Sequence, residues 1–301
     1  MTPAPVVAVW HAEAAWRRLN DYLVLTKPRV VAMVLVTTAV GFHLGSAGSP
    51  LFLPLLYTLA GTALSAGGTL ALNQYMERDV DAQMDRTRHR PLPEGRVHPG
   101  EALVLGCVLL VAGVGVLALA VEPLAAVVTA AIAITYLFVY TPLKRVSSLC
   151  SLVGAVPGAL PPVAGWVAAR GTLGPEPWIL FAIMFLWQIP HTLAIGRMYR
   201  DDYARAGIRV LPVVDRDGRT TGLQAVTNCL ALLPVGVLPT LVGLAGVAYF
   251  VIALVLGITF LWTAVGLARG GSTADARRLL FASLVYLPVL LAVMAFDKPA
   301  S

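Results

Sequence analysis

The sequence predicts an all-α, polytopic membrane protein with nine transmembrane helices. Composition, the length of the apolar segments and the distribution of basic residues all indicate this fold class. Of the 301 residues, 58% are hydrophobic and only 13% are charged, whereas a soluble domain carries roughly 25% charged residues. No stretch of about 100 residues has the mixed polar and apolar composition of a soluble domain. Water is therefore not the main solvent of this chain.

Nine apolar segments are long enough to cross a membrane as a helix, which takes about 20 mostly apolar residues. The segments are residues 29–47, 52–75, 101–121, 123–141, 149–168, 177–198, 223–243, 246–267 and 277–296. The polar remainder of the chain is too small to enclose nine such helices inside a soluble protein. We therefore divide the chain into a cytoplasmic amino-terminal segment (1–28), a single transmembrane domain (29–296) and a short carboxy-terminal tail (297–301).

Basic residues fall almost entirely on one side of the predicted helices. With alternating spans, only Arg170 and Lys298 of the 22 Lys and Arg residues lie on the other side. Because Lys and Arg favour the cytoplasmic side, the amino terminus and the long polar loops are expected in the cytoplasm and the carboxy terminus outside, in a cell (inner) membrane. The net charge of +6 belongs to these membrane-flanking loops, which lack a nucleic-acid-binding motif. We therefore expect no nucleic-acid partner.

The second predicted helix ends in a polar stripe. Asn73, Glu77 and Asp81 follow one another at intervals of four residues, and each such step turns a helix by only about 40°. Ionisable groups at membrane depth are costly and usually functional, although a solvated loop with local salt bridges is an alternative. The stripe therefore predicts three catalytic, metal-binding side chains.

The sixth predicted helix also ends in a loop that is rich in both charges, with Asp201, Asp202 and Arg205. Mg²⁺ prefers oxygen ligands and is commonly held by one or two carboxylates together with substrate phosphates. Arg and Lys bind the remaining phosphate charge. Two such loops above apolar helices predict Mg²⁺ and a substrate with a diphosphate head and a long apolar tail, such as an isoprenyl diphosphate.

The candidate residues form two sets. The candidate metal ligands are Asn73, Glu77, Asp81, Asp201 and Asp202, of which all but Asp201 are also candidate catalytic residues. The candidates for binding the diphosphate are Arg86, Arg90, Lys144, Arg145 and Arg205.

At these loops the chain resembles the UbiA-type intramembrane prenyltransferases. The first motif of that family has Asn, an acid four residues later, a second acid after four more, and then Arg-Thr and Arg-Pro. The matching residues are Asn73, Glu77, Asp81, Arg86-Thr87 and Arg90-Pro91. Gln74, Tyr199 and Tyr203 stand where many quinone-pathway members carry acids. The chain instead resembles the heme O synthase branch, in residues 26–29, 140–145, 161–166, 187–203 and 211–214.

This resemblance implies nine helices around a central cavity, farnesyl diphosphate as the donor, Mg²⁺ as the cofactor and heme b as the acceptor. The product would be heme O for terminal oxidases, which makes oxidase-biogenesis proteins candidate partners besides membrane lipid. His191, Tyr203 and His43 are candidates for contact with the acceptor, although a hydrogen-bonded core histidine is an alternative for each His. Two other functions stay open: a prenyltransferase for a quinone precursor or another aromatic or tetrapyrrole acceptor, and a transporter or oxidase-assembly protein without catalysis.

Overall fold

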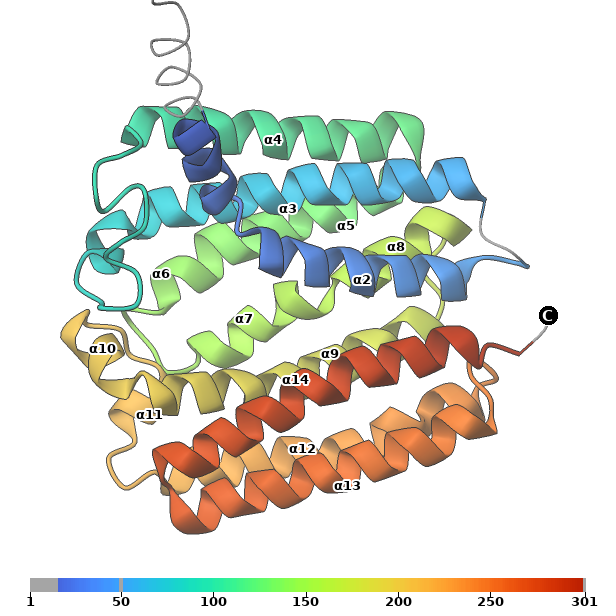
Figure 1. Cartoon of the computed structure of the whole chain (residues 1–301). Helices are drawn as coiled ribbons and strands as arrows, with labels where there is room; N and C mark the ends of the chain where they lie inside the picture. Colours follow the sequence, from blue (N-terminus) through green and yellow to red (C-terminus); the bar gives the residue numbers. More distant parts are fainter. Residues whose placement is uncertain (1–15, 49–50, 300–301) are drawn as a thin grey trace, which may run out of the picture.

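The computed structural model describes residues 16–48 and 51–299, and every regular element in these ranges is a helix (Figure 1). In this part of the chain, nine helical segments are long and apolar enough to cross a membrane, which confirms the predicted fold class. They are α2 (Pro28–Gly45), α3 (Phe52–Asp81), α4 (Pro99–Ala120), α5 with its continuation (Pro123–Leu143), α7 and α8 (Cys150–Arg170), α9 (Glu176–Met198), α12 (Arg219–Leu241), α13 (Val247–Gly270) and α14 (Thr273–Phe296).

The helix α3 differs most from its predicted length. The apolar segment predicts an end at residue 75, but the helix continues to Asp81. The continuation carries the polar stripe, so Glu77 and Asp81 are held on a helix and not on a loop. Residues 82–98, the short helix α10 (Arg200–Arg205) and α11 (Leu211–Val214) gather at the same end of the bundle (Figure 1).

Two of the spanning segments are not continuous α-helices. The fifth is interrupted at Leu160, between α7 (Cys150–Ala159) and α8 (Pro161–Arg170), because proline lacks the N–H that a helix interior needs. The fourth changes from α5 (Pro123–Ile134) to a π-helix, η1 (Thr135–Tyr140), before the short α6 (Thr141–Leu143). Single π-helical turns often occur at functional sites.

The helices form two packed groups. One large core of buried apolar side chains joins α9, α12, α13 and α14, with Leu193, Leu232, Phe260 and Leu290 among its members, and it also includes side chains of α2, α7 and α8. The helices α2, α3, α5 and α8 pack on one another in the other group, and α14 also packs against α2. The second group contains the pockets described below.

Two glycines bring α2 and α8 into backbone contact. A Cβ atom added at Gly41 would collide with the backbone of Pro162, and one added at Gly165 would collide with the backbone of Thr38. Neither obstacle is a flexible side chain that could move aside. The close approach of these two helices therefore depends on both glycines.

We expect Gly41→Ala to lower the free energy of unfolding by about 1–3 kcal/mol, the usual cost of overpacking. Thermal unfolding of the purified protein in detergent measures this effect. Gly115→Ala is the matched control, because a Cβ at Gly115 on α4 meets no atom within 4 Å. An equal midpoint for Gly41→Ala and the wild type would contradict the assigned helix contact.

Candidate functional site

A polar pocket lies where the loops after α3 and α9 meet. Residues from before α2, from α3, from η1 and from both loops line it: Lys27, Asn73, Glu77, Val80, Asp81, Met84, Arg86, Arg90, Tyr136, Tyr140, Lys144, Tyr203, Ile208 and Val210. The structure thus brings seven of the predicted site residues together, namely Asn73, Glu77, Asp81, Arg86, Arg90, Lys144 and Tyr203. Their sequence positions span more than 120 residues.

Each carboxylate of the α3 stripe faces a basic side chain. Lys144 Nζ lies 2.8 Å from Glu77 Oε1, and Arg90 Nη1 lies 2.6 Å from Asp81 Oδ2. The Thr87 hydroxyl donates to the Asp81 carbonyl oxygen at 2.8 Å, which folds the chain back so that Arg90 reaches the stripe. An uncompensated buried charge is expensive, so these pairs stabilise the ionised carboxylates at the membrane boundary.

Lys27 is a pocket residue that our candidate set did not include. It precedes Pro28, has a left-handed backbone with φ 49°, and donates from Nζ to Asn73 Oδ1 at 3.1 Å. Burial, together with the positive charges of Arg90 and Lys144, lowers the pKa of Lys27 to about 7. The only sequence signal for this lysine is its place in the family-like segment 26–29.

Asn73 and Gln74 both connect α3 to other elements. The Asn73 amide also donates to the Thr141 hydroxyl at 3.1 Å. Gln74 Nε2 donates to the carbonyl oxygens of Val24 and Leu25, at 3.2 and 2.8 Å. A carboxylate could not donate these bonds, so the structure gives a physical reason for glutamine at a position where many relatives in the quinone branch have an acid.

The second loop holds Arg86 over the pocket. The guanidinium carbon lies 5.3 Å from the ring centre of Tyr199 and 5.7 Å from that of Tyr203, and Arg86 Nη2 donates to the Tyr203 hydroxyl at 3.2 Å. The backbone N–H groups of Asp85 and Arg86 donate to the Asp202 carboxylate, both at 3.4 Å. Aromatic faces attract guanidinium groups, so these residues fix the position of one cation.

Six of the predicted site residues are not among those that line the pocket: Arg145, Asp201, Asp202 and Arg205, and the two histidines described below. Asp202 faces the first loop and also pairs with Arg205, whose guanidinium lies 2.6 Å from Asp85. Asp201 and Arg145 are exposed. The two loops therefore contact each other. Asp202 makes this contact by accepting from the backbone of the first loop, and it does not line the pocket as the sequence predicts for a metal ligand.

The oxygen atoms of Asn73, Glu77 and Asp81 fit a metal that completes its coordination with substrate. Within residues 16–48 and 51–299, no three Asp, Glu, His or Cys side chains converge as a metal cage. Mg²⁺ seldom uses such a cage and is commonly bound by one or two carboxylates plus phosphate oxygens and water. The stripe supplies this donor set.

His43 and His191 lie against α14, and neither is among the residues that line the two pockets described here. His43 Nε2 lies 3.1 Å from the Ala295 carbonyl oxygen. His191 Nδ1 lies 2.8 Å from Ser283 Oγ, and the Ser283 hydroxyl itself donates to the Leu280 carbonyl oxygen at 2.6 Å. Contact of either His with an acceptor stays a prediction.

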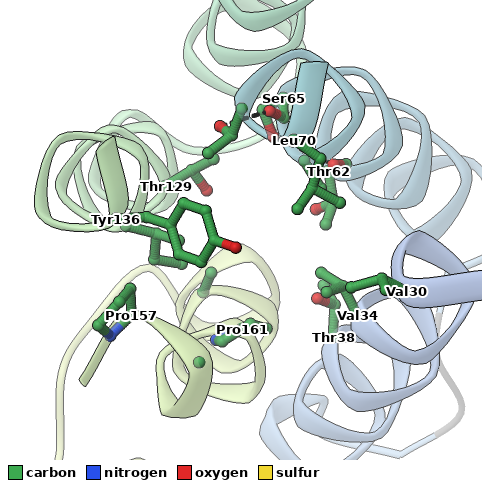
Figure 2. Close-up of a pocket in the computed structure, with 15 residues that line it drawn as sticks. Val30, Val34, Thr38, Thr62, Ser65, Leu70, Thr129, Tyr136, Pro157 and Pro161 are labelled. Carbon is green, nitrogen blue, oxygen red and sulfur yellow. Dashed lines mark hydrogen bonds between the residues drawn. The ribbon is translucent and has the colours of Figure 1, made fainter. Parts of the chain in front are cut away.

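An apolar pocket adjoins the polar one, and Tyr136 lines both. Its walls come from α2, α3, α5, η1, α7 and α8: Val30, Val34, Thr38, Thr62, Ser65, Ala66, Thr69, Leu70, Thr129, Ile132, Tyr136, Pro157, Gly158, Pro161 and Ala164. The Tyr136 hydroxyl points into this pocket (Figure 2). A charged site that continues into an apolar one suits a ligand with an anionic head and a hydrocarbon tail.

Similar proteins of known sequence match almost the whole chain. Two are named protoheme IX farnesyltransferase. The protein from Solibacter usitatus (strain Ellin6076) is 46% identical, over 93% of this chain and 99% of its own length. The protein from Koribacter versatilis (strain Ellin345) is 44% identical, over 93% of this chain and 94% of its own length.

Solved structures share the fold at low sequence identity. A digeranylgeranylglyceryl phosphate synthase aligns with a TM-score of 0.79 at 17% identity, covering 94% of this chain and 99% of that one. A UbiA homologue from Archaeoglobus fulgidus, bound to GPP and Mg²⁺, aligns with a TM-score of 0.66 at 18% identity, covering 91% of this chain and 99% of that one. The model of the UbiA prenyltransferase family matches residues 34–285, and the chain therefore belongs to this family.

Proposed function

We propose that this protein transfers the farnesyl group of farnesyl diphosphate to the vinyl group of heme b, giving heme O and diphosphate. The observation that carries the transferase chemistry is the polar pocket that continues into an apolar pocket at Tyr136. The choice of heme b and farnesyl diphosphate is supported by the relatives named protoheme IX farnesyltransferase, at 46% and 44% identity over 93% of the chain.

Asn73, Glu77 and Asp81 would hold Mg²⁺, which neutralises part of the diphosphate charge when it is bound. Lys27, Arg86, Arg90 and Lys144 lie around the stripe and would bind the remaining phosphate oxygens. These cations stabilise the negative charge that develops on the leaving diphosphate. Because Arg86 already contacts two tyrosine rings and the Tyr203 hydroxyl, binding it to phosphate costs less conformational entropy. Asp202 would support this arrangement by accepting hydrogen bonds from the backbone N–H groups of Asp85 and Arg86. We keep Asp201 and Arg205, in the same loop, as further candidate site residues.

The reaction breaks the allylic C–O bond, and its electron pair leaves with the diphosphate. The π electrons of the heme vinyl group form the new C–C bond to the farnesyl carbon, and water then adds to the resulting cation and loses a proton. Tyr136 and Tyr140, whose ring centres lie 5.1 Å apart, present aromatic faces that stabilise nearby positive charge. The apolar walls below keep bulk water from the farnesyl cation.

Membranes that contain this protein should form a heme with a farnesyl and hydroxyl addition from farnesyl diphosphate and heme b, as measured by mass spectrometry. We expect Asp81→Asn to reduce this product at least 100-fold, because the metal and Arg90 both lose their carboxylate partner. Asp79→Asn, an exposed carboxylate on the same helix, is the control with unchanged yield. Prenylation of an aromatic acid but not of heme b would favour the quinone-precursor alternative, and no prenylation at all would favour a transporter or an assembly protein.

We expect the two loops to act on one diphosphate. Asp202→Ala should raise the KM for farnesyl diphosphate about tenfold, because Arg86 loses the carboxylate that accepts its backbone N–H. Glu77→Ala should raise the same KM and the Mg²⁺ requirement. Residues that act as a unit are non-additive, so the double variant should lose less than the product of the two single effects. Strict additivity, or a defect of Asp202→Ala confined to heme affinity, would assign the second loop to the acceptor.

We also propose that the amino terminus and both loops face the cytoplasm and that the carboxy terminus lies outside. The supporting observations are the imbalance of basic residues in the sequence and the gathering of the polar loops at one end of the bundle (Figure 1). A reporter inserted beside Gly218 should be active in the cytoplasm, and one fused after Ser301 should be active outside. Activity of both reporters on one side would contradict nine alternating spans.

A further inference from the structure

The apolar pocket contains two buried hydroxyl groups that have no hydrogen-bond partner within the described part of the chain. They belong to Thr38 on α2, which is 0% exposed, and Thr62 on α3, which is 6% exposed. Both side chains line the pocket, from opposing helices (Figure 2). Most buried hydroxyls find a partner, so two orphaned ones in an apolar pocket call for a functional explanation.

Neighbouring threonines on the same two helices behave differently. Thr37 Oγ1 donates to the Val34 carbonyl oxygen, and Thr58 Oγ1 donates to the Pro54 carbonyl oxygen, both at 2.8 Å. Such a bond to the preceding turn is the usual way for a helical threonine to satisfy its hydroxyl. Ser65 and Thr69, which line the same pocket nearer to the polar end of α3, also donate to backbone carbonyl oxygens of their own helix. Thr38 and Thr62 thus differ both from their neighbours outside the pocket and from the hydroxyls higher in it.

The two orphaned hydroxyls lie at the same depth below the polar pocket. The contact between Lys27 and Asn73, at 3.1 Å, lies at the edge of the polar pocket that is nearest to the apolar one. Thr38 follows Lys27 by eleven residues and Thr62 precedes Asn73 by eleven residues, on helices that run in opposite directions. At a rise of 1.5 Å per residue, both hydroxyls lie about 16 Å from this contact.

At Thr38 and beyond it, α2 and α8 are in backbone contact, which leaves no space between these two helices. The α2 backbone at Thr38 meets Gly165, and one turn further on Gly41 meets the backbone of Pro162. No side chain can rotate away there to lengthen the pocket. Of the residues on α2 and α3 that line the apolar pocket, Thr38 and Thr62 are the ones farthest from the polar pocket.

We propose that these two hydroxyls form a polar floor that limits the prenyl donor to three isoprene units. The inference rests on the proposed use of a prenyl diphosphate. With bonds of about 1.5 Å, an extended farnesyl chain is about 14 Å long and ends just above the floor, and a fourth isoprene unit adds about 5 Å. That unit would press hydrocarbon onto both hydroxyls and exclude the water that can otherwise bind them. Leaving buried polar groups unpaired is an effective way to reject an unsuitable substrate.

Thr38→Val and Thr62→Val test the floor, because valine keeps the shape of threonine and removes the hydroxyl. We expect each variant to raise kcat/KM for geranylgeranyl diphosphate relative to farnesyl diphosphate about tenfold, with a larger change in the double variant. Binding without heme provides a second readout: the increase in Tm produced by each diphosphate with Mg²⁺ should shift in the same direction. Thr37→Val and Thr58→Val are matched controls and should leave both ratios within about twofold of the wild type.

An unchanged preference in the double variant would overturn the proposal, and so would an equal change in the two control variants. A selective loss of the farnesyl reaction in Thr38→Val or Thr62→Val would also overturn it, because the hydroxyls would then bind a polar group of a substrate. Failure of the proposed function has a different signature. In that case neither diphosphate would stabilise the wild-type protein. If only the floor is wrong, both diphosphates still stabilise the wild-type protein, and the variants leave the chain-length preference unchanged.

Discussion

Charge compensation at the membrane boundary determines how the polar end of this protein folds. Glu77 and Asp81 stand on a helix that emerges from an apolar bundle, where an unpaired ionised carboxylate is costly. The partner of Glu77 comes from a distant part of the chain, since Lys144 follows the fourth span, whereas the partner of Asp81 is Arg90 in the loop directly after α3. Lys27, before the first span, bonds to Asn73 one turn below. One face of α3 thus gathers three separate segments around itself, and the pocket is the space between them.

The same compensation prepares the pocket for a charged substrate. Basic side chains that are held beside carboxylates need little movement to contact phosphate oxygens, so the ordering cost of binding is low. The pocket carries three cations, Arg86, Arg90 and Lys144, but only two carboxylates, Glu77 and Asp81. Lys27, whose pKa is lowered to about 7, adds further positive charge when it is protonated. This excess of positive charge suits an anionic head group, and the apolar pocket beyond Tyr136 suits the hydrocarbon that follows.

The sequence predicts the nine spans well, because a membrane requires long apolar segments and every backbone group must be paired within a helix. It also predicts the α3 stripe, since a spacing of four residues is a local property of one helix. It does not predict the role of Lys27, because a lysine just before a transmembrane helix looks in the sequence like any basic residue that sets membrane topology. The position of Tyr136 depends on a π-helical turn, and the contacts of His43 and His191 depend on α14, more than 90 residues away. Such features come from tertiary packing and leave no local pattern.

The second loop shows how this chain departs from an acid-rich arrangement. The rings of Tyr199 and Tyr203 both contact the guanidinium of Arg86, at the positions where the resemblance implies acids in the quinone branch. Carboxylates there would cancel two positive charges of the pocket and would need additional cations to hold the same diphosphate. Neutral aromatic faces leave the charge of Arg86 available, and Asp202 fixes the backbone that carries it. In this chain the second loop therefore contacts the pocket through an arginine that belongs to the first loop, which makes the contact between the two loops part of the pocket's construction.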